Sequence, residues 1–208
     1  MIKILEKRVA DKIAAGEVVD RPLSVVKELV ENAIDAGATS IICEIQKGGK
    51  SYIRVTDNGH GISSEQVETA FLRHATSKIA EAEDLDHIGT LGFRGEALAS
   101  IAAVSGVEMI TRTGEEKVGA KLVVEGGQIV AKEPTGCEEG TTIIVQDLFY
   151  NTPARLKFMK SDATESTLIV DFFSRMALAY PHIKMRMINN RNILSSTRGD
   201  GDRWRTIL

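Results

Sequence analysis

The sequence predicts one α+β domain in which helices cover one face of a β-sheet. Its length of 208 residues suits a single domain. The stretches 22–37 and 162–180 carry apolar residues at helical spacing, whereas stretches within 40–57 and 107–145 alternate apolar and polar residues as strands do. Glycine-containing turns separate the later strands, so we expect these strands to form a meander.

The first long helix separates its apolar and polar residues. One broad face, at about 100° per residue, holds Val26, Leu29, Val30, Ala33 and Ile34. The opposite side holds Glu28, Glu31, Asn32 and Asp35. Pro22 stands near the start of the helix and Gly37 ends it. Residues 1–20 carry only a short apolar pattern, and we expect them to form an arm before this helix.

The polar side of this helix concentrates negative charge. Carboxylates on neighbouring turns repel one another, so Glu28, Glu31 and Asp35 destabilise an isolated helix. A cation, or a ligand that carries one, would offset this repulsion. A solvated acidic face is the plainer interpretation, and the helix alone favours it.

A β-hairpin is predicted next, from Ser40–Gln46 and Tyr52–Asp57 with a turn at Gly48-Gly49. The period of two places Asp57 on the same face as Ile53 and Val55. A carboxylate on a core face is costly unless a donor reaches it, so we expect a polar donor at the end of this strand. The alternative is a turn aspartate that accepts a bond from its own backbone.

A weakly patterned segment follows the hairpin. Ser63 and Gln66 resemble a capping box, which predicts a short helix as far as Phe71. The stretch from Arg73 to Gly89 has little pattern, and a long unpatterned stretch in a compact domain is typical of a functional lid.

Glycines at 89, 92 and 95 then precede a helix expected from Glu96 to about Val104. Glycines let a backbone approach a ligand closely, and the start of a helix offers free N–H groups. Arg94 adds a cation, so the segment suits a phosphate group. A flexible loop is the alternative.

Strands are predicted at 107–113, 120–124, 128–132 and 141–145. A polar-aromatic connector at 148–155 leads to a helix that Asp162 and Glu165 cap and Pro181 ends. The apolar stripe of this helix indicates core packing. Two short strands, around 183–188 and 192–194, come last, and we expect a further domain to follow them.

Composition and spacing exclude several classes of protein. The 26 basic and 29 acidic residues argue against a chain that binds nucleic acid through its overall charge. The stretch 184–205 is basic, which signals a nucleic-acid contact only weakly because strand ends are commonly solvated and charged. No apolar run approaches the roughly 18 residues of a membrane span, and the N-terminus does not resemble a signal peptide.

The cysteines and histidines do not indicate a metal site. Cys43 and Cys137 stand far apart without C-x-x-C spacing, which predicts reduced thiols in a cytoplasmic protein. The four histidines form no ligand cluster with them, so zinc is not expected.

The sequence does not match the common phosphate-binding and nucleophile motifs. A P-loop ending in Gly49-Lys50-Ser51 would need glycine at 44, where the chain has Glu44. No G-x-G-x-x-G follows a strand, and no G-x-S-x-G is present.

Four parts in order resemble the GHKL ATPase superfamily: a polar helix stripe, a core-facing aspartate, a glycine loop before a helix, and a Gly-Thr-Thr strand start at 140–142. Within it the chain is similar to the N-terminal half of the MutL family of DNA mismatch repair proteins. The similarity runs from about Ile4 to the end and rests on the blocks 16–22 (GEVVDRP), 28–38 (ELVENAIDAGA), 73–78 (RHATSK), 92–98 (GFRGEAL) and 148–155 (LFYNTPAR).

The resemblance implies roles for individual residues. Glu28 would be the general base that activates water at the γ-phosphate of ATP, and Asn32 would coordinate Mg²⁺. Asp57 would accept the exocyclic amine of adenine, and Thr141 would support the base through its hydroxyl or a water. Glu31 and Asp35 are left as structural residues.

The loop segments would complete the nucleotide site. Gly92, Phe93, Arg94 and Gly95, with the start of the following helix, would wrap the phosphates. Thr76, Ser77 and Lys78 would lie in the lid near the nucleotide.

The resemblance also implies a two-layer α/β sandwich with a mixed, largely antiparallel sheet. It predicts an N-terminal arm at 1–20, an ATPase domain at 21–200, and at 201–208 a linker to a second domain that supplies a lysine to the γ-phosphate. Implied partners are the mismatch-recognition protein MutS, downstream repair factors, DNA bound weakly, and a second copy of the chain on ATP binding. No membrane partner is expected, and the location would be cytoplasmic, with the bacterial nucleoid.

Two hypotheses follow. The chain is a slow Mg²⁺-dependent ATPase, or it is a nucleotide-gated dimerisation module in which hydrolysis is negligible and the lid and arm become ordered.

Overall fold

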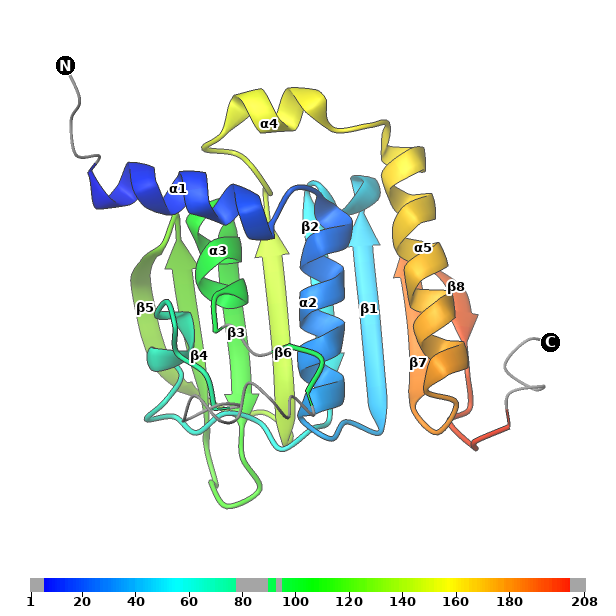
Figure 1. Ribbon diagram of the computed structural model, residues 1–208. Coiled ribbons are helices and arrows are strands. Elements are labelled where there is room, and N and C mark those ends of the chain that lie inside the picture. Colours follow the sequence, from blue (N-terminus) through cyan, green and yellow to red (C-terminus); the bar gives the residue numbers. More distant parts are fainter. Residues whose placement is uncertain (1–5, 78–89, 93–94, 203–208) are drawn as a thin grey trace.

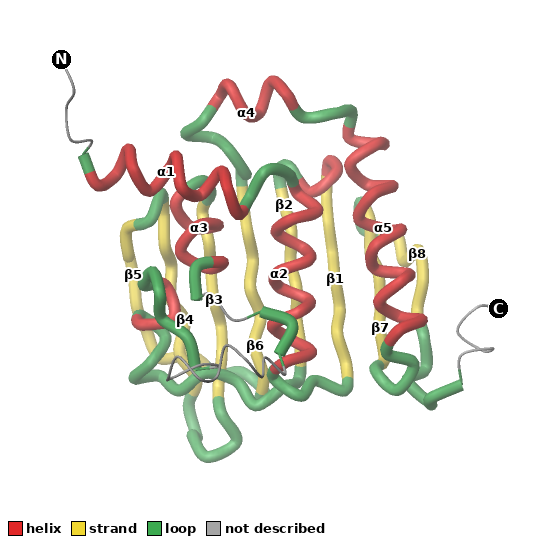
Figure 2. The backbone as a smooth tube through the Cα atoms, in the orientation of Figure 1, coloured by secondary structure: helices red, strands yellow, loops and turns green. Residues whose placement is uncertain are grey.

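A computed structural model of the chain describes residues 6–77, 90–92 and 95–202. These residues form an eight-stranded sheet in the order β5-β4-β3-β6-β2-β1-β7-β8, with helices on one face (Figures 1 and 2). The parallel pair is β1 with β7, and the other neighbours are antiparallel. The predicted two-layer, mixed and largely antiparallel architecture is therefore confirmed.

The strands are β1 Ser40–Gln46, β2 Tyr52–Asp57, β3 Gly106–Arg112, β4 Gly119–Glu125, β5 Gln128–Thr135, β6 Gly140–Gln146, β7 Lys184–Asn189 and β8 Asn192–Ser196. The α-helices are α1 Lys7–Val18, α2 Pro22–Asp35, α3 Ala97–Ala103, α4 Pro153–Phe158 and α5 Asp162–Ala179. Short 3₁₀ turns occur at Lys47–Gly49 and Thr69–Phe71. The predicted first helix, hairpin and terminal strands are confirmed.

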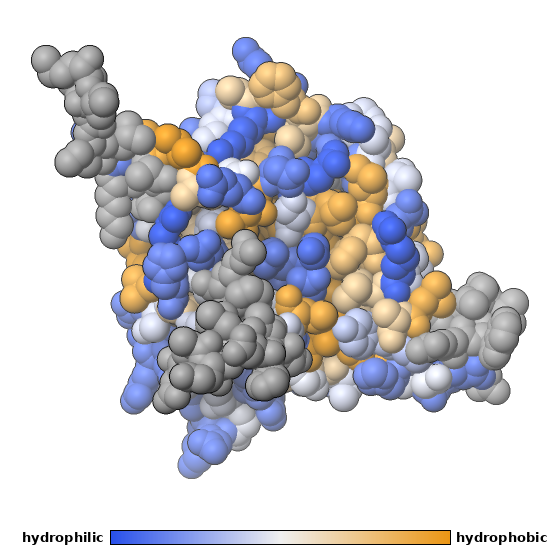
Figure 3. Space-filling view, viewed as in Figure 1, coloured by the Kyte–Doolittle hydropathy of each residue, from blue (hydrophilic) through white to orange (hydrophobic). Residues whose placement is uncertain are grey.

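The core lies between the sheet and the helices. Alternate residues of the central strands are buried, including Ile41, Cys43 and Ile45 of β1 and Ile53 and Val55 of β2. The apolar face of α2 covers them with Val25, Val26, Leu29, Val30 and Ala33. Helices α2 and α5 pack on each other, and apolar surface shows between them on this side (Figure 3).

The predicted meander is wrong in one respect. Strand β6 does not follow β5 in the sheet but lies between β3 and β2. Burial explains the placement, because Ile143 and Val145 of β6 are buried core residues, whereas β5 is exposed along almost its whole length and occupies the edge of the sheet.

The predicted helix from Ser63 to Phe71 is also wrong. Only a 3₁₀ turn at Thr69–Phe71 forms there. The N–H and the hydroxyl of Ser64 donate to the Glu116 carboxylate at 2.9 and 2.7 Å, so the start of this segment is tied to the turn after β3.

The start of α5 differs from the predicted cap. Ser161 is the N-cap, and its hydroxyl accepts a bond from the N–H of Thr164 at 3.2 Å. Glu165 is fully buried and accepts bonds from Arg21 at 3.2 Å and from the N–H of Lys160 at 3.1 Å. Glu165 therefore ties α5 to the chain before α2.

The predicted N-terminal arm contains α1, which packs against α3. The guanidinium of Arg155 donates to the carbonyl oxygen of Lys12 at 3.1 Å and lies over Gly16, where a Cβ would collide with it. Part of the predicted connector forms α4. The domain boundaries proposed from the sequence stay predictions.

Among the residues that the structure describes, every helix is too short or too polar to span a membrane. Both cysteines are free thiols, as predicted. Burial raises the pKa of the Cys43 thiol to about 12, so Cys43 is a core residue and not a nucleophile.

Candidate functional site

The end of β2 places a carboxylate on the helix-covered face of the sheet. Ile53 and Val55 are buried there, and Asp57 follows on the same face. The Asp57 carboxylate accepts a bond from the N–H of Gly59 at 2.8 Å, as expected of a turn aspartate. Burial nevertheless raises the pKa of Asp57 to about 6, against the opposing effect of the Gly59 and Thr141 backbone N–H groups. These internal bonds do not offset the loss of solvent around the carboxylate.

The turn after Asp57 is wedged between α2 and the neighbouring strands. The N–H of His60 donates to the carbonyl oxygen of Ala36 at 3.0 Å, just beyond α2. Gly61 has a φ of 71°, and a Cβ there would collide with the carbonyl of Arg112. Gly140 has a φ of 119°, and a Cβ there would collide with the backbone of Asp57. Glycine at both positions lets β2, β3 and β6 converge closely around the carboxylate.

Two threonines continue this wall of the site. Thr141 is the register partner of Asp57 on one side and of Thr111 on the other. The Thr111 hydroxyl is fully buried, lies 3.0 Å from that of Thr141, and donates to the carbonyl oxygen of Gly140 at 2.9 Å. Thr111 also accepts the N–H of Ile62 at 2.9 Å. Sequence reasoning identified Thr141 but missed Thr111, whose only signal was a hydroxyl on the core face of its strand.

Helix α2 presents its polar stripe along the edge of its buried face. Glu28, Asn32 and Asp35 are half-buried and lie at i, i+4 and i+7, so they share one side of the helix. Asp35 accepts bonds from the N–H of Leu91 at 3.0 Å and of Gly92 at 3.3 Å. The stripe that carries Glu28 and Asn32 therefore ends at the glycine loop. Sequence reasoning left Asp35 as structural and did not anticipate this contact.

The two loop blocks also meet. Gly95 has a φ of 62°, and a Cβ there would collide with the backbone of Ala75. The ring of His74 lies 3.2 Å from the Glu96 carboxylate. Thr76 and Ser77 therefore lie in a segment that runs against the loop before α3. Lys78, Phe93 and Arg94, which the sequence assigned to the site, lie outside the described residues.

The predicted site residues thus form two groups. Asp57 and Thr141 meet at the strand ends, and Glu28, Asn32 and Gly92 are connected through α2 and Asp35. An amide oxygen such as that of Asn32 fits a hard cation such as Mg²⁺, which takes oxygen ligands. In the part of the chain that the structure describes, no cluster of three or more His, Cys, Asp or Glu side chains could hold a metal ion.

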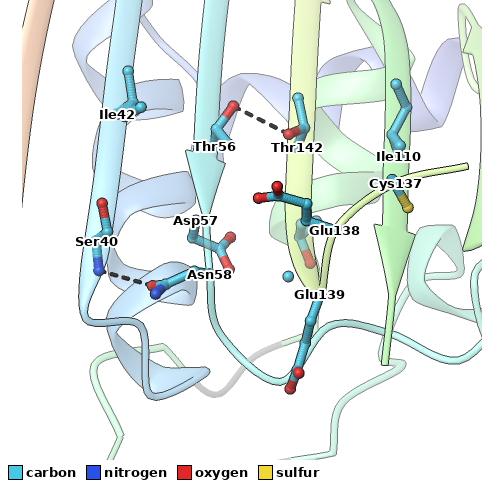
Figure 4. Close-up of a pocket in the computed structure, with 12 residues that line it drawn as sticks. Ser40, Ile42, Thr56, Asp57, Asn58, Ile110, Cys137, Glu138, Glu139 and Thr142 are labelled. Carbon is cyan, nitrogen blue, oxygen red and sulfur yellow. Dashed lines mark hydrogen bonds between the residues drawn. The ribbon is translucent and has the colours of Figure 1, made fainter. Parts of the chain in front are cut away.

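A cavity of about 310 Å³ lies on the opposite face of the sheet. Figure 4 shows it with the helices behind the sheet, lined by Ile42, Thr56, Thr142 and Ile110 and bordered by Glu138 and Glu139. These strand residues alternate with the buried ones, so they point away from α2. The cavity reaches Asp57 and Thr141 only at the strand ends and does not include Glu28 or Asn32.

Comparisons with known proteins agree with this arrangement. Residues 21–135 match the family described as "Histidine kinase-, DNA gyrase B-, and HSP90-like ATPase". The chain is 55% identical over 202 residues to a DNA mismatch repair protein MutL of Agathobacter rectalis and 54% identical over 202 residues to one of Shouchella clausii. Each match covers 97% of this chain but 31% of the relative, so the chain spans about a third of the length of these curated relatives.

Solved structures show the same fold. The Aquifex aeolicus MutL ATPase domain complexed with ADP matches with a TM-score of 0.77 and 33% identity, covering 91% of this chain and 68% of that one. A structure described as the N-terminal domain of a DNA repair protein matches with a TM-score of 0.81 and 31% identity, covering 95% of this chain and 59% of that one.

Proposed function

Because the chain belongs to the histidine kinase-, DNA gyrase B- and HSP90-like ATPase family, and within it to the MutL ATPase domains, we propose that it binds ATP with Mg²⁺ and hydrolyses it slowly. The observation that carries this proposal is the contact of Asp35 with the glycine loop. It connects the loop that would hold phosphates to the helix stripe that holds Glu28 and Asn32.

The base would lie at the strand ends. The Asp57 carboxylate has the backbone N–H groups of Gly59 and Thr141 as donors, and its two oxygens retain capacity for a further donor, which the exocyclic amine of adenine would supply. Such a donor favours the charged carboxylate and so opposes the burial that raises its pKa. Thr141 stands beside Asp57 and supports the base.

The phosphates would extend along α2 toward the glycine loop. Gly95 lies close to the backbone of Ala75 because it lacks a side chain, and Asp35 fixes the start of this loop through the backbone N–H groups of Leu91 and Gly92. Thr76 and Ser77, together with Lys78, Phe93 and Arg94, would close over the nucleotide. Asn32 would hold Mg²⁺, which neutralises charge on the phosphate oxygens.

Glu28 would perform the chemical step by holding and deprotonating a water molecule. The water oxygen forms a bond to the γ-phosphorus, the bond from that phosphorus to the bridging oxygen breaks, and ADP leaves with the bridging oxygen. Phosphoryl transfer depends mainly on positioning and charge stabilisation, so one correctly placed carboxylate is sufficient.

The test is substitution of Glu28 in this chain. Glu28→Ala should leave the Kd for Mg²⁺–ATP, measured by calorimetry, within about threefold, and should lower single-turnover hydrolysis by about 100-fold or more. Asp171→Ala, which removes an exposed carboxylate of α5, is the control and should change neither quantity. Normal hydrolysis by Glu28→Ala with intact binding would exclude Glu28 as the base.

The packing of α1 favours a switch as a second function. Helix α1 packs against α3, which follows the glycine loop directly, so ordering of that loop by nucleotide would act on the N-terminal arm. Two copies would then associate, and hydrolysis would reset the pair. Light scattering should show a doubled mass with a non-hydrolysable ATP analogue; an unchanged mass at saturating analogue would contradict the switch.

The names of the curated relatives support a role in DNA mismatch repair. The partners of such a role would be MutS, downstream repair factors and DNA, with the chain acting as the nucleotide-dependent part of a longer protein.

A further inference from the structure

We propose that Thr111 is a positioning residue that holds the Thr141 hydroxyl as a hydrogen-bond acceptor toward the ligand, and thereby makes the base pocket prefer a purine with an amino group at C6 over one with a keto oxygen there. This inference deepens the proposed nucleotide function and rests on it. It rests on which group donates and which accepts in each hydrogen bond of a small network, at the end of β3 and the start of β6.

The network has one central atom. The Oγ1 of Thr111 lies 2.9 Å from the N–H nitrogen of Ile62, 2.9 Å from the carbonyl oxygen of Gly140 and 3.0 Å from the Oγ1 of Thr141. Thr111 is 0% exposed, so these three neighbours satisfy its hydroxyl without solvent. A hydroxyl has one proton to donate and two lone pairs that accept.

The neighbours determine the direction of each bond. The carbonyl oxygen of Gly140 can only accept, so it takes the single proton of Thr111. The N–H of Ile62 can only donate and occupies one lone pair. The remaining lone pair of Thr111 must accept from Thr141. The Thr141 proton is thus committed to the protein interior, and only its oxygen lone pairs are available to a ligand.

Like Thr141, Asp57 offers the ligand only hydrogen-bond acceptors. Thr141 is its register partner, and an ionised carboxylate offers acceptors only. The two side chains therefore form a wall that complements a donor. An amino group at C6 of a purine satisfies these acceptors, whereas the 6-keto oxygen of inosine or guanosine would face acceptors alone and remain unpaired.

The test compares ATP with ITP, which carries a keto oxygen in place of the amine. Calorimetry on this chain gives Kd(ITP)/Kd(ATP) for the parent, Thr111→Val and Thr111→Ser. Valine keeps the shape but removes the hydroxyl, which frees the Thr141 proton to donate, so the ratio should fall by about fivefold or more. Serine keeps the hydroxyl and should keep the ratio. A general loss of structure would weaken both nucleotides and leave the ratio unchanged, which would overturn the proposal.

Thr111→Val also deprives the Ile62 N–H of its acceptor and can fail to fold, so a second variant is needed. Thr141→Val removes the acceptor from the pocket side without touching that bond, and it should lower the ratio as well. An unchanged ratio in this variant would also overturn the proposal.

A measurement without nucleotide separates this inference from the proposed function. In NMR spectra of the free chain, the Thr141 hydroxyl proton should show contacts to Thr111, and the Thr111 proton should show contacts to Gly140. The reverse assignment would overturn the inference even if ATP binds. Failure of the parent to bind either nucleotide, with the hydroxyl assignment intact, would overturn the proposed function instead.

Discussion

The turns that follow β2 and β3 hold two carboxylates in opposite ways. Both strands are antiparallel to β6, so they run in the same direction and end at the same edge of the sheet. Glu116, after β3, accepts bonds from the N–H and hydroxyl groups of Ser64 and Thr113 at 2.7–3.3 Å. These donors lower the pKa of Glu116 to about 2. Burial instead raises the pKa of Asp57 to about 6.

The difference distinguishes a structural carboxylate from one that is arranged for a ligand. Glu116 is saturated by donors from its own chain, and these bonds join the segment after β2 to the turn after β3. Asp57 lies on a core face with fewer internal donors, so its negative charge destabilises the folded state. At neutral pH, a rise in the pKa from 3.8 to about 6 corresponds to a loss of about 3 kcal/mol in the free energy of unfolding.

The largest expected effect comes from removing the charge of Asp57. Asp57→Asn replaces an acceptor by an amide that can present its donor to the adenine amine, so the Kd for Mg²⁺–ATP should rise by about 100-fold or more. Calorimetry measures the change. Glu116→Gln is the matched control at the same sheet edge and should leave the Kd unchanged. Loss of binding in both variants would contradict the distinction between Glu116 as a structural carboxylate and Asp57 as a ligand-binding one.

The same variant should be more stable than the parent in the absence of nucleotide. Asparagine keeps the shape and the Gly59 bond but has no charge to desolvate, so unfolding at pH 7.5 should require up to about 3 kcal/mol more free energy. Denaturant titration measures this value. A destabilised Asp57→Asn would show that the carboxylate supports the fold and is not held at a cost.

The two carboxylates should also give opposite pH dependence. Asp57 has a folded pKa of about 6, above its usual 3.8, so its favourable contribution is present below pH 3.8 and is lost as pH rises through 6. Glu116 has a folded pKa of about 2, below its usual 4.5, so its contribution is present above pH 4.5 and is lost as pH falls through 2.

A pH series of melting curves tests this contrast. The gain in Tm from Asp57→Asn should shrink as pH falls from 7.5 to 4, because the parent carboxyl becomes protonated and its penalty disappears. Carboxyl NMR titration should place the Asp57 midpoint near 6 and that of Glu116 near 2. A midpoint near 4 for Asp57 would mean that its surroundings are wetter than the structure indicates.

Local patterns explain which parts of the site the sequence could predict. The face of Asp57 followed from the alternation of Ile53 and Val55, and the stripe of α2 followed from helical spacing. The missed features depend on partners far away in the chain. Thr111 meets Thr141 only through the β3–β6 register, and Asp35 meets Leu91 56 positions later.

The errors in the fold have the same origin. No local pattern could place β6 between β3 and β2. The order of the strands depends on which strand is covered by a neighbouring strand on each side, and this is set by parts of the chain that are distant in the sequence. The predicted capping box paired Ser63 with Gln66, but the N–H and the hydroxyl of the adjacent Ser64 donate to Glu116, 52 residues away. The start of this segment is therefore fixed by a carboxylate that is distant in the sequence, which no local pattern shows.

The smallest expected effect is that of Glu116→Gln on stability. Glutamine keeps an oxygen that can accept but loses the charge that strengthens the bonds from Ser64 and Thr113, so Tm should fall by a few degrees at most at pH 7. The loss should shrink as pH falls to 2, where about half of the parent carboxyl is already neutral. The turn is exposed to solvent and salt, which limits the effect. A loss of Tm as large as the gain from Asp57→Asn would mean that the two carboxylates affect stability in opposite directions but by equal amounts. Glu116 would then hold the edge of the nucleotide site together.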